Sequence, residues 1–469
     1  MTLPFKKLLV ANRGEIACRV LRTAERLGLR TVAVFSDADV TAPHVALADE
    51  AVRVGAAPVK ESYLNVPALL AALADTGADA VHPGYGLLSE NAEFAEAVAA
   101  AGATFVGPSP AAMRLVGDKI EARKSALAAG LAPPPGSDGP VDPNAVESLR
   151  AEAERIGFPL LVKAAGGGGG IGMQIARDLA ELERAAKTCS ERARAAFLDA
   201  RVYVERYLEH PRHIELQVLC DAQGGVAILG ERECSVQRRY QKIIEESPSP
   251  ADFFQGDAGA ELRARLAERA TALMASVGYT GAGTLELVAD AQGNAYFLEV
   301  NARIQVEHPV TELVTGIDIV EQQLRIAAGE RLSASVLAVK PAGHAVEARL
   351  YAENPAAGFV PQPGRLERFR LPEGLPGVRI DAGYAERGEI TPHYDPLIAK
   401  IVGFGATRAE AIARLDAALA ATELVLVGPR GPRATNLAFL RAVLAAAEFQ
   451  AGDYDTGLAE AVALRQKSA

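Results

Sequence analysis

The spacing of apolar residues predicts alternating strands and helices in the first third of the chain. Ile16, Val20 and Leu27 recur near helical spacing, between two continuous apolar runs typical of buried strands. The expected elements are strands at 7–12, 30–36, 78–85 and 104–109 and helices at 14–28 and 91–102. This βαβ order predicts a parallel sheet covered by helices. Ligands of such sheets bind at the carboxyl ends of the strands, so residues 11–15 and 82–91 should open onto a site.

The pattern changes after residues 130–143, which are rich in Pro and Gly and indicate a linker or long turn. Residues 151–178 predict a helix and then a strand hairpin with a glycine-rich tip. Strands dominate from 202 to 307, interrupted by one helix at 261–278. Further strands follow from 343, with helices expected at 407–424 and 433–446. The predicted fold class is therefore α/β, with an α+β central part.

Composition narrows the class of protein. The chain has 469 residues, and 49% of them are hydrophobic. A chain of this length is too long for a single core and suggests about two to four domains. A net charge of −10 does not favour a nucleic-acid partner. No segment has the apolar length of a membrane helix or a signal peptide, and the four cysteines form no C-x-x-C pair. We expect a cytoplasmic protein with reduced thiols.

Five consecutive glycines, Gly166 to Gly170, follow Lys163 between two predicted strands. Glycine lets backbone N–H groups approach a ligand closely, and a run of them forms an anion-binding concavity. The flanking strands and the absence of G-K-[ST] exclude a Rossmann fingerprint and a Walker A loop, and no H-R-D or D-F-G sequence indicates a protein kinase. We interpret the run as a flap over a nucleotide; the alternative is a surface loop without a ligand.

Two glutamates predict a metal site. If the turn between their strands centres on residues 290–295, Glu286 faces Glu299 and Val288 faces Phe297 across an antiparallel ladder. Opposed like charges are destabilising unless a cation lies between them. Asn301 points to the same face as Glu299. Two carboxylates and an amide oxygen suit Mg²⁺ or Mn²⁺ beside phosphates; the alternative is a solvated sheet face.

Residues 301–312 continue this strand with Arg303, Gln305 and Glu307 alternating on one side. A cation and a carboxylate near a metal–phosphate centre could bind and deprotonate a small oxyanion, although a structural ion pair is the alternative. Residues 231–246 add a basic cluster, Arg238, Arg239 and Lys242 with Gln237. Such clusters are often solvated, but this one lies between the flap and the metal face, which favours anion binding.

Several stretches in this order resemble biotin carboxylase of the ATP-grasp superfamily. They are VANRGEIACRVLR, HPGYGLLSEN, GDK, VKAAGGGGG, HPRHIELQVL, QRRYQK and EVNARIQVEHPVTE, within residues 5 to 450. The resemblance implies a Rossmann-like N-terminal domain at 1–117, an ATP-grasp domain at 118–330 with a flap subdomain at about 135–207, a C-terminal biotin carboxylase domain at 331–450, and a tail at 451–469.

The resemblance also implies a role for each matching residue. The residues expected to bind ATP are Lys119, Lys163, Gly169, Gly170, Glu205, Arg206, Tyr207, Leu208, His213, Gln237 and Tyr240. The metal ligands are Glu286, Glu299 and Asn301, holding two Mg²⁺ or Mn²⁺ ions. The pocket for bicarbonate and biotin consists of Lys242, Arg303, Gln305, Val306, Glu307 and Arg349.

The implied reaction is the ATP- and bicarbonate-dependent carboxylation of biotin through carboxyphosphate. Lys242, Arg303, Glu307 and Arg349 are the expected catalytic residues, with Glu307 as the base. None of the four methionines precedes a lysine, as the family's biotin-attachment site requires, so we expect a separate biotin carrier protein or domain. A carboxyltransferase subunit and a homodimer are the other implied partners.

Two positions depart from the family pattern. Ile171 stands where the family often has arginine, and Tyr240 where it often has histidine. Both changes remove a cation near the nucleotide. They leave two alternatives open, namely an ATP-grasp ligase that makes another carboxylated or acyl-phosphate product, and a nucleotide-binding subunit with altered activity.

Overall fold

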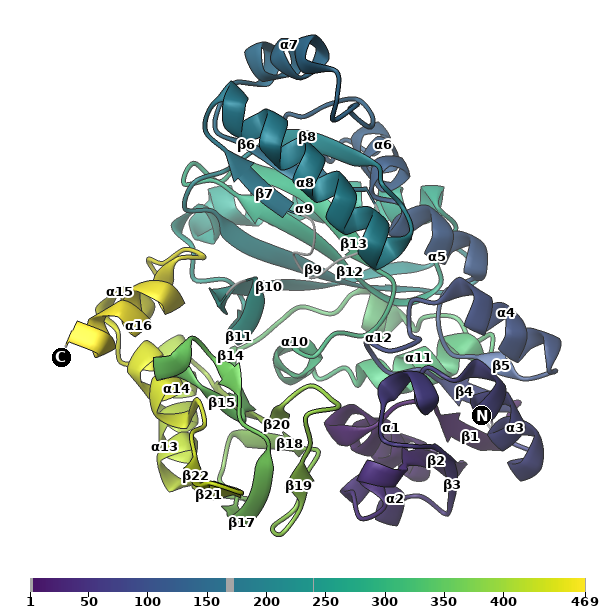
Figure 1. Cartoon of the computed structure of the whole chain (residues 1–469). Helices are drawn as coiled ribbons and strands as arrows, with labels where there is room; N and C mark the ends of the chain where they lie inside the picture. The colour runs from purple at the N-terminus through teal and green to yellow at the C-terminus, as the bar shows by residue number, and fades with distance from the viewer. Residues whose placement is uncertain (1–2, 166–172, 239, 469) are drawn as a thin grey trace.

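The N-terminal part is a parallel sheet in the computed structural model, which describes residues 3–165, 173–238 and 240–468 (Figure 1). All five strands run parallel in the order β3-β2-β1-β4-β5, as the alternating pattern predicted. The strands are β1 Lys7–Val10, β2 Arg30–Ser36, β3 Glu50–Gly55, β4 Ala80–His82 and β5 Thr104–Phe105. The helices are α1 Gly14–Arg26, α2 Pro43–Leu47, α3 Val66–Thr76, α4 Ala92–Ala100, α5 Pro110–Gly117 and α6 Lys119–Ala128.

A small three-stranded sheet in the order β7-β6-β8 lies at the top of Figure 1 with its two helices. Its strands are β6 Leu160–Ala164, β7 Met173–Ala176 and β8 Val202–Arg206, and its helices are α7 Val146–Ile156 and α8 Leu179–Phe197. Strands β6 and β7 pair antiparallel, which confirms the predicted hairpin. Gly169, Gly170 and Ile171 lie outside the described residues.

An antiparallel sheet of eight strands crosses the centre of the molecule in the order β13-β12-β9-β10-β11-β14-β20-β18. The strands are β9 Arg212–Cys220, β10 Val226–Arg238, β11 Gln241–Ser247, β12 Gly281–Ala289, β13 Ala295–Asn301, β14 His344–Tyr351, β18 Val378–Ala382 and β20 Leu397–Gly405. The helices beside it are α9 Gly256–Ser276, α10 His308–Thr315, α11 Ile319–Ala327 and α12 Ala334–Leu337. Strands from the central and C-terminal parts of the chain therefore share one sheet.

The two faces of this sheet differ because side chains alternate along each strand. Ile214, Leu216 and Leu285 join an apolar core with Leu266 of α9. Intervening polar residues such as Glu215 turn to the opposite face, where α10 lies. Most of the predicted site residues lie on this polar face.

The C-terminal part adds a four-stranded sheet in the order β19-β17-β21-β22, a two-stranded sheet of β15 and β16, and four helices. The remaining strands are β15 Glu353–Asn354, β16 Val360–Pro361, β17 Gly364–Arg370, β19 Glu389–Ile390, β21 Glu423–Gly428 and β22 Gly431–Arg433. The helices are α13 Arg408–Ala421, α14 Leu437–Leu444, α15 Ala447–Ala451 and α16 Leu458–Ser468. Buried Phe449 and Tyr454 fix the end of the chain against the central sheet, where Arg212 Nη2 donates to the Gly452 carbonyl at 2.5 Å. In the described part of the chain, no helix combines the length and apolar character needed to cross a bilayer.

Candidate active site

Three glutamates stand in a row across three neighbouring strands of the polar face. Glu215 on β9 is paired with Glu286 on β12, and Glu286 is paired with Glu299 on β13. The predicted pairing of the last two is confirmed. The predicted pairing of Val288 with Phe297 is wrong, because a register shift after Glu286 places Leu287 opposite Phe297. Three like charges in line require cations around them.

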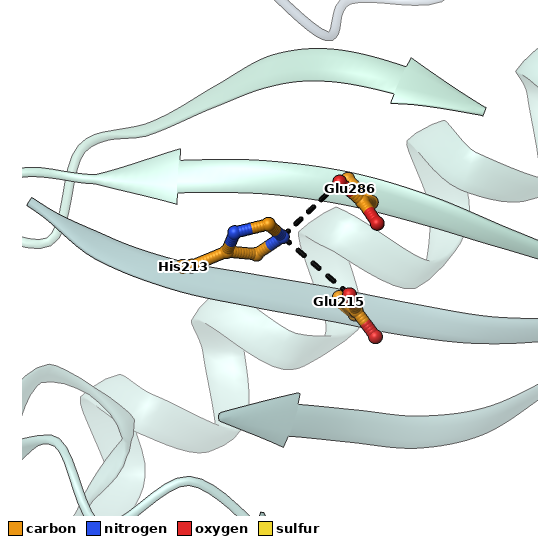
Figure 2. A group of neighbouring side chains, drawn as sticks. All are labelled: His213, Glu215 and Glu286. Carbon is orange, nitrogen blue, oxygen red and sulfur yellow. Dashed lines mark ion pairs between the residues drawn. The ribbon is translucent and has the colours of Figure 1, made fainter. Parts of the chain in front are cut away.

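His213 lies over two members of this row (Figure 2). Its Nε2 is 3.2 Å from Glu286 and 3.4 Å from Glu215, and its Nδ1 is 2.8 Å from Gln237 Nε2. Burial alone would lower the pKa of His213, but Glu286 and Glu215 outweigh it and raise the pKa to about 9. The two carboxylates therefore favour a proton on Nε2, the ring nitrogen that faces the row.

Lys242 on β11 forms ion pairs with three carboxylates. Its Nζ contacts Glu215, lies 2.9 Å from Glu286 and 2.8 Å from Glu307. Burial would lower the pKa of Lys242, but the three carboxylates raise it well above its usual value. The ammonium stays charged and stands at the centre of the predicted oxyanion pocket.

Arg232 on β10, a residue that the sequence reasoning missed, supports the row from within the protein. It is fully buried, and its guanidinium lies 2.9 Å from Glu215 and donates to Gln305 Oε1 at 2.7 Å. Gln305 in turn donates to Glu286 Oε1 at 2.8 Å. A buried arginine with this set of partners fixes the position of the polar cluster rather than offering a free cation.

Glu307 lies between two cations. One carboxylate oxygen is 2.8 Å from Lys242 Nζ, and the other is 2.8 Å from Arg349 Nη2 on β14. Burial would raise the pKa of Glu307, but Lys242, Arg349 and Arg232 lower it below its usual value. The carboxylate is thus ionised at neutral pH, as a base must be.

Residues 302–307 do not continue β13 as a strand, so the predicted alternation of Arg303, Gln305 and Glu307 is wrong. The strand ends at Asn301, the chain bends, and Glu307 is the N-cap residue of α10. Gln305 and Glu307 still reach the polar cluster. The loop is held by Lys400 of β20, whose Nζ donates to the Val306 carbonyl at 2.8 Å.

Arg303 points toward the N-terminal part of the chain. Its Nε lies 3.1 Å from Glu90 Oε2, and its Nη2 donates to Asn301 Oδ1 at 3.1 Å. Opposing the effect of burial, Glu90 and Glu307 raise the pKa of Arg303. Arg303 thereby links Asn301 to the segment 82–91, which the sheet topology predicted to border the site.

Two predicted phosphate-binding lysines are paired with carboxylates. Lys119 Nζ is 3.1 Å from Glu299, and Lys163 Nζ is 3.0 Å from Glu205. Glu205 also pairs with Arg123 at 2.7 Å, so its side chain is engaged within the protein. Strand β8 runs on through Arg206, which pairs with Leu160, and Tyr207 N then donates to the Pro159 carbonyl at 2.9 Å.

A cavity of about 570 Å³ lies beside the end of β8. It is lined by Tyr207, Gln237 and Tyr240 together with Thr456 and Leu464 from the end of the chain. Arg206 and Leu208, which are also predicted to bind ATP, flank Tyr207. Arg206 N donates to the Pro135 carbonyl at 2.6 Å. Tyr240 is exposed and has a φ of +68°, an uncommon conformation for a tyrosine.

The donor atoms suit a hard divalent cation. Glu286 and Glu299 are directly opposed, and Asn301 adds an amide oxygen two residues along the same strand. Among the described residues, the groups whose ligand atoms lie within 4.8 Å of one another are His213 with Glu215 and Glu286, and Glu215 with Cys234 and Glu307. These are groups of three or more His, Cys, Asp or Glu, and Glu299 belongs to neither.

Comparisons with known proteins agree with this geometry. Three family profiles match the chain in series: "Biotin carboxylase, N-terminal domain" at residues 4–113, "Carbamoyl-phosphate synthase L chain, ATP binding domain" at 118–335, and "Biotin carboxylase C-terminal domain" at 347–461. The biotin carboxylase of Haemophilus influenzae is 46% identical, covering 95% of this chain and 96% of that protein. This chain belongs to the biotin carboxylase family.

Other relatives include larger carboxylases. The propionyl-CoA carboxylase alpha chain of Ruegeria pomeroyi is 47% identical, covering 96% of this chain and 67% of that one. Among solved structures, the biotin carboxylase domain of the Hydrogenobacter thermophilus 2-oxoglutarate carboxylase has a TM-score of 0.91 and 42% identity, covering 97% of each chain. That structure is a dimer in complex with MgADP, ADP and bicarbonate. The family thus serves carboxylases with different final acceptors.

The sequence carried a signal for the residues that were missed. After the predicted His213, Glu215 and Gln217 alternate with Ile214, Leu216 and Val218 along β9. Period-two polar residues in a strand whose other positions are buried and apolar indicate a polar face inside the protein. Arg232 is the residue on β10 paired with Glu215, and it completes that face.

Proposed function

We propose that this biotin carboxylase is a component of an acyl-CoA carboxylase and carboxylates biotin held on a separate carrier protein or domain. The observation that supports this proposal is the position of Glu307 between Lys242 and Arg349. An ionised carboxylate flanked by two cations can accept a proton from an anion that the same cations attract. Bicarbonate is a small anion with a proton to lose.

In the first step, Glu307 takes the proton of bicarbonate, and a bicarbonate oxygen attacks the γ-phosphate of ATP. ADP leaves, and carboxyphosphate forms. Lys242 and Arg303 hold the bicarbonate oxygens, while Lys119 and Lys163 bind the phosphates. A divalent cation at Glu286, Glu299 and Asn301 would supply charge neutralisation on the phosphoryl oxygens.

In the second step, carboxyphosphate releases CO₂ and phosphate. The phosphate takes the N1′ proton of biotin, and the resulting ureido anion attacks CO₂. Arg303 and Arg349 stabilise the negative charge that develops on the ureido oxygen. Arg349 suits this task because it is buried and its guanidinium is held by two carboxylates.

The residues that bind the nucleotide, the partners and the domain limits belong to the same proposal. His213, Gln237, Tyr240 and residues 205–208 bind the nucleotide, and the flap with Gly169 and Gly170 covers it. Homodimer formation, a carboxyltransferase partner and a cytoplasmic location stay predictions. The proposed limits are 1–117, 118–330 with the flap subdomain at about 135–207, 331–450, and a terminal segment 451–469.

ATP hydrolysis with free biotin as acceptor tests the function. The purified chain should release ADP when ATP, Mg²⁺ and bicarbonate are present, and free biotin should increase the rate. Omission of bicarbonate should abolish the increase. ATP hydrolysis that biotin does not change would favour another ATP-grasp ligase.

A further inference from the structure

Two buried glutamates face each other behind Arg349. Glu245 on β11 and Glu347 on β14 are direct partners in the antiparallel ladder, and both are fully buried. Directly opposed residues of such a ladder have Cβ atoms about 5 Å apart and point to the same face. Neither residue was predicted to have a role, and neither is used in the reaction above.

Arg349 lies between Glu245 and the base. Its Nη2 is 2.5 Å from Glu245 and 2.8 Å from Glu307, so one guanidinium serves two carboxylates. A bulge in β11 brings Glu245 to this position. The ladder with β10 passes from Lys242 opposite Gln237 directly to Ile244 opposite Val236, which leaves Ile243 as an extra residue. Lys242 and Glu245 consequently both reach the surroundings of Glu307.

Glu347 has no donor of its own. Within residues 3–165, 173–238 and 240–468, no group donates a hydrogen bond to the buried carboxyl oxygens of either glutamate, but Glu245 has an ion pair with Arg349. The nearby cation Lys400 already donates to the Val306 carbonyl and lies 3.2 Å from Glu15. The other charged groups that act on the pair are Arg349, Glu307 and Lys242.

Two ionised carboxylates that face each other inside the protein, away from solvent, cost a large amount of free energy. Burial raises the pKa of Glu245 to about 7 although Arg349 opposes it, and burial raises the pKa of Glu347 well above its usual value although Lys400 opposes it. A proton on one of the two removes the repulsion and supplies the missing donor. Since Arg349 contacts Glu245 and not Glu347, the proton belongs on Glu347.

We propose that Glu245 is a positioning residue for Arg349, and that a protonated Glu347 donates a hydrogen bond to Glu245, so that the pair carries one negative charge. The effect of this pair on catalysis rests on the proposed function. When Glu307 takes up the bicarbonate proton, it loses the charge that attracts Arg349. Glu245 keeps its charge and holds the guanidinium in place for the biotin step.

The proton on Glu347 can be observed without turnover. Infrared difference spectra between the wild type and Glu347→Gln at neutral pH should contain the C=O band of a buried carboxylic acid, lost in the variant. Glu96→Gln, at an exposed pair with Arg114, is the control and should lose no such band. Glutamine keeps the size of the side chain and an N–H donor, which favours folding. A difference spectrum without this band would overturn the shared proton.

Turnover tests the positioning role. Glu245→Gln should lower biotin-dependent turnover by about 10- to 100-fold, as expected for a displaced catalytic group, with the KM for ATP little changed. Glu245→Asp keeps the charge and should recover part of the loss. Glu347→Gln should lose less than Glu245→Gln, because the donor remains. A folded Glu245→Gln variant with the biotin kinetics of the wild type would overturn the role of Glu245.

The two proposals fail in different ways. If the wild type shows no biotin-stimulated turnover, the proposed function is wrong, and the infrared band still decides whether Glu347 is protonated. If the wild type is active and both Glu245 variants match it, the function stands and the positioning role is wrong.

Discussion

Glu286 and Glu299 are directly opposed on β12 and β13, but each is paired with different cations. Glu286 is close to Lys242 and His213, whereas Glu299 is paired with Lys119 at 3.1 Å. Neighbouring strands thus present two carboxylates, one set among the catalytic groups and the other beside a lysine predicted to bind phosphate. An ion bound by both would connect the phosphates to the bicarbonate pocket.

Replacement of Glu299 should remove metal-dependent turnover. In Glu299→Ala, one of the two opposed carboxylates is lost, so the cation that neutralises the phosphoryl oxygens loses a ligand. We expect ATP turnover to fall by about 100-fold or more at saturating Mg²⁺, a loss comparable to that of one oxyanion-stabilising donor. Steady-state ADP release measures it, and an unchanged far-UV circular dichroism spectrum shows that the fold is kept.

The exposed Glu96→Ala provides the matched control for Glu299, because Glu96 pairs with Arg114 at the surface. Its turnover should equal that of the wild type. If Glu299→Ala keeps wild-type turnover and the same dependence on Mg²⁺, the metal assignment is wrong.

Replacement of Arg232 should destabilise the protein strongly. Arg232→Met removes the fully buried guanidinium that lies beside Glu215 and donates to Gln305, and removal of one partner of a buried ion pair costs about 3–5 kcal/mol. Urea unfolding followed by fluorescence should show a lower midpoint. The exposed Arg114→Met is the control and should change the free energy of unfolding by about 1 kcal/mol or less. Similar losses for both variants would contradict a supporting role for Arg232.

Glu246 should make stability depend on pH in the acid range. Burial would raise the pKa of Glu246, but hydrogen bonds from His344 and Arg408 lower it from 4.5 to about 2. A carboxyl whose pKa is lower in the folded state stabilises the fold above pH 4.5, and this contribution is lost as the pH falls toward 2. The loss amounts to about 3 kcal/mol.

Thermal unfolding between pH 6 and pH 3 tests the contribution of Glu246 to stability, because the wild type and Glu246→Gln differ in this one carboxyl group. The midpoint of the wild type should fall more steeply than that of Glu246→Gln, which starts lower and has no carboxyl to protonate. Parallel curves would contradict the assignment. Glu246 also accepts a hydrogen bond from Tyr454 at 2.5 Å, so its loss should loosen α15 and α16 first.

Local pattern was enough to predict the parallel sheet, the hairpin of β6 and β7, and the opposition of Glu286 and Glu299. Each depends on residues close in sequence or on alternation along a strand. The pairing of Val288 with Phe297 failed because one bulge shifts the register, and alternation carries no signal for a bulge. The predicted strand beyond Asn301 failed because the chain bends there toward α10.

The supporting residues could not be placed from local pattern. Glu245 and Glu347 are 102 positions apart in the printed sequence and become neighbours only because β14 joins the central sheet beside β11. Arg232 meets Gln305 across 73 positions. Charges inside apolar strands were visible in the sequence, but their partners are fixed by the order of the strands.

Transfer of labelled bicarbonate to free biotin tests the central claim most directly. The wild type, given ATP, Mg²⁺ and biotin, should form acid-labile labelled carboxybiotin, and Glu307→Gln should form about 100-fold less, because the base is lost. Arg114→Met should match the wild type. A wild-type protein that transfers no label, or a Glu307→Gln variant that transfers as much as the wild type, would contradict biotin carboxylation with Glu307 as the base.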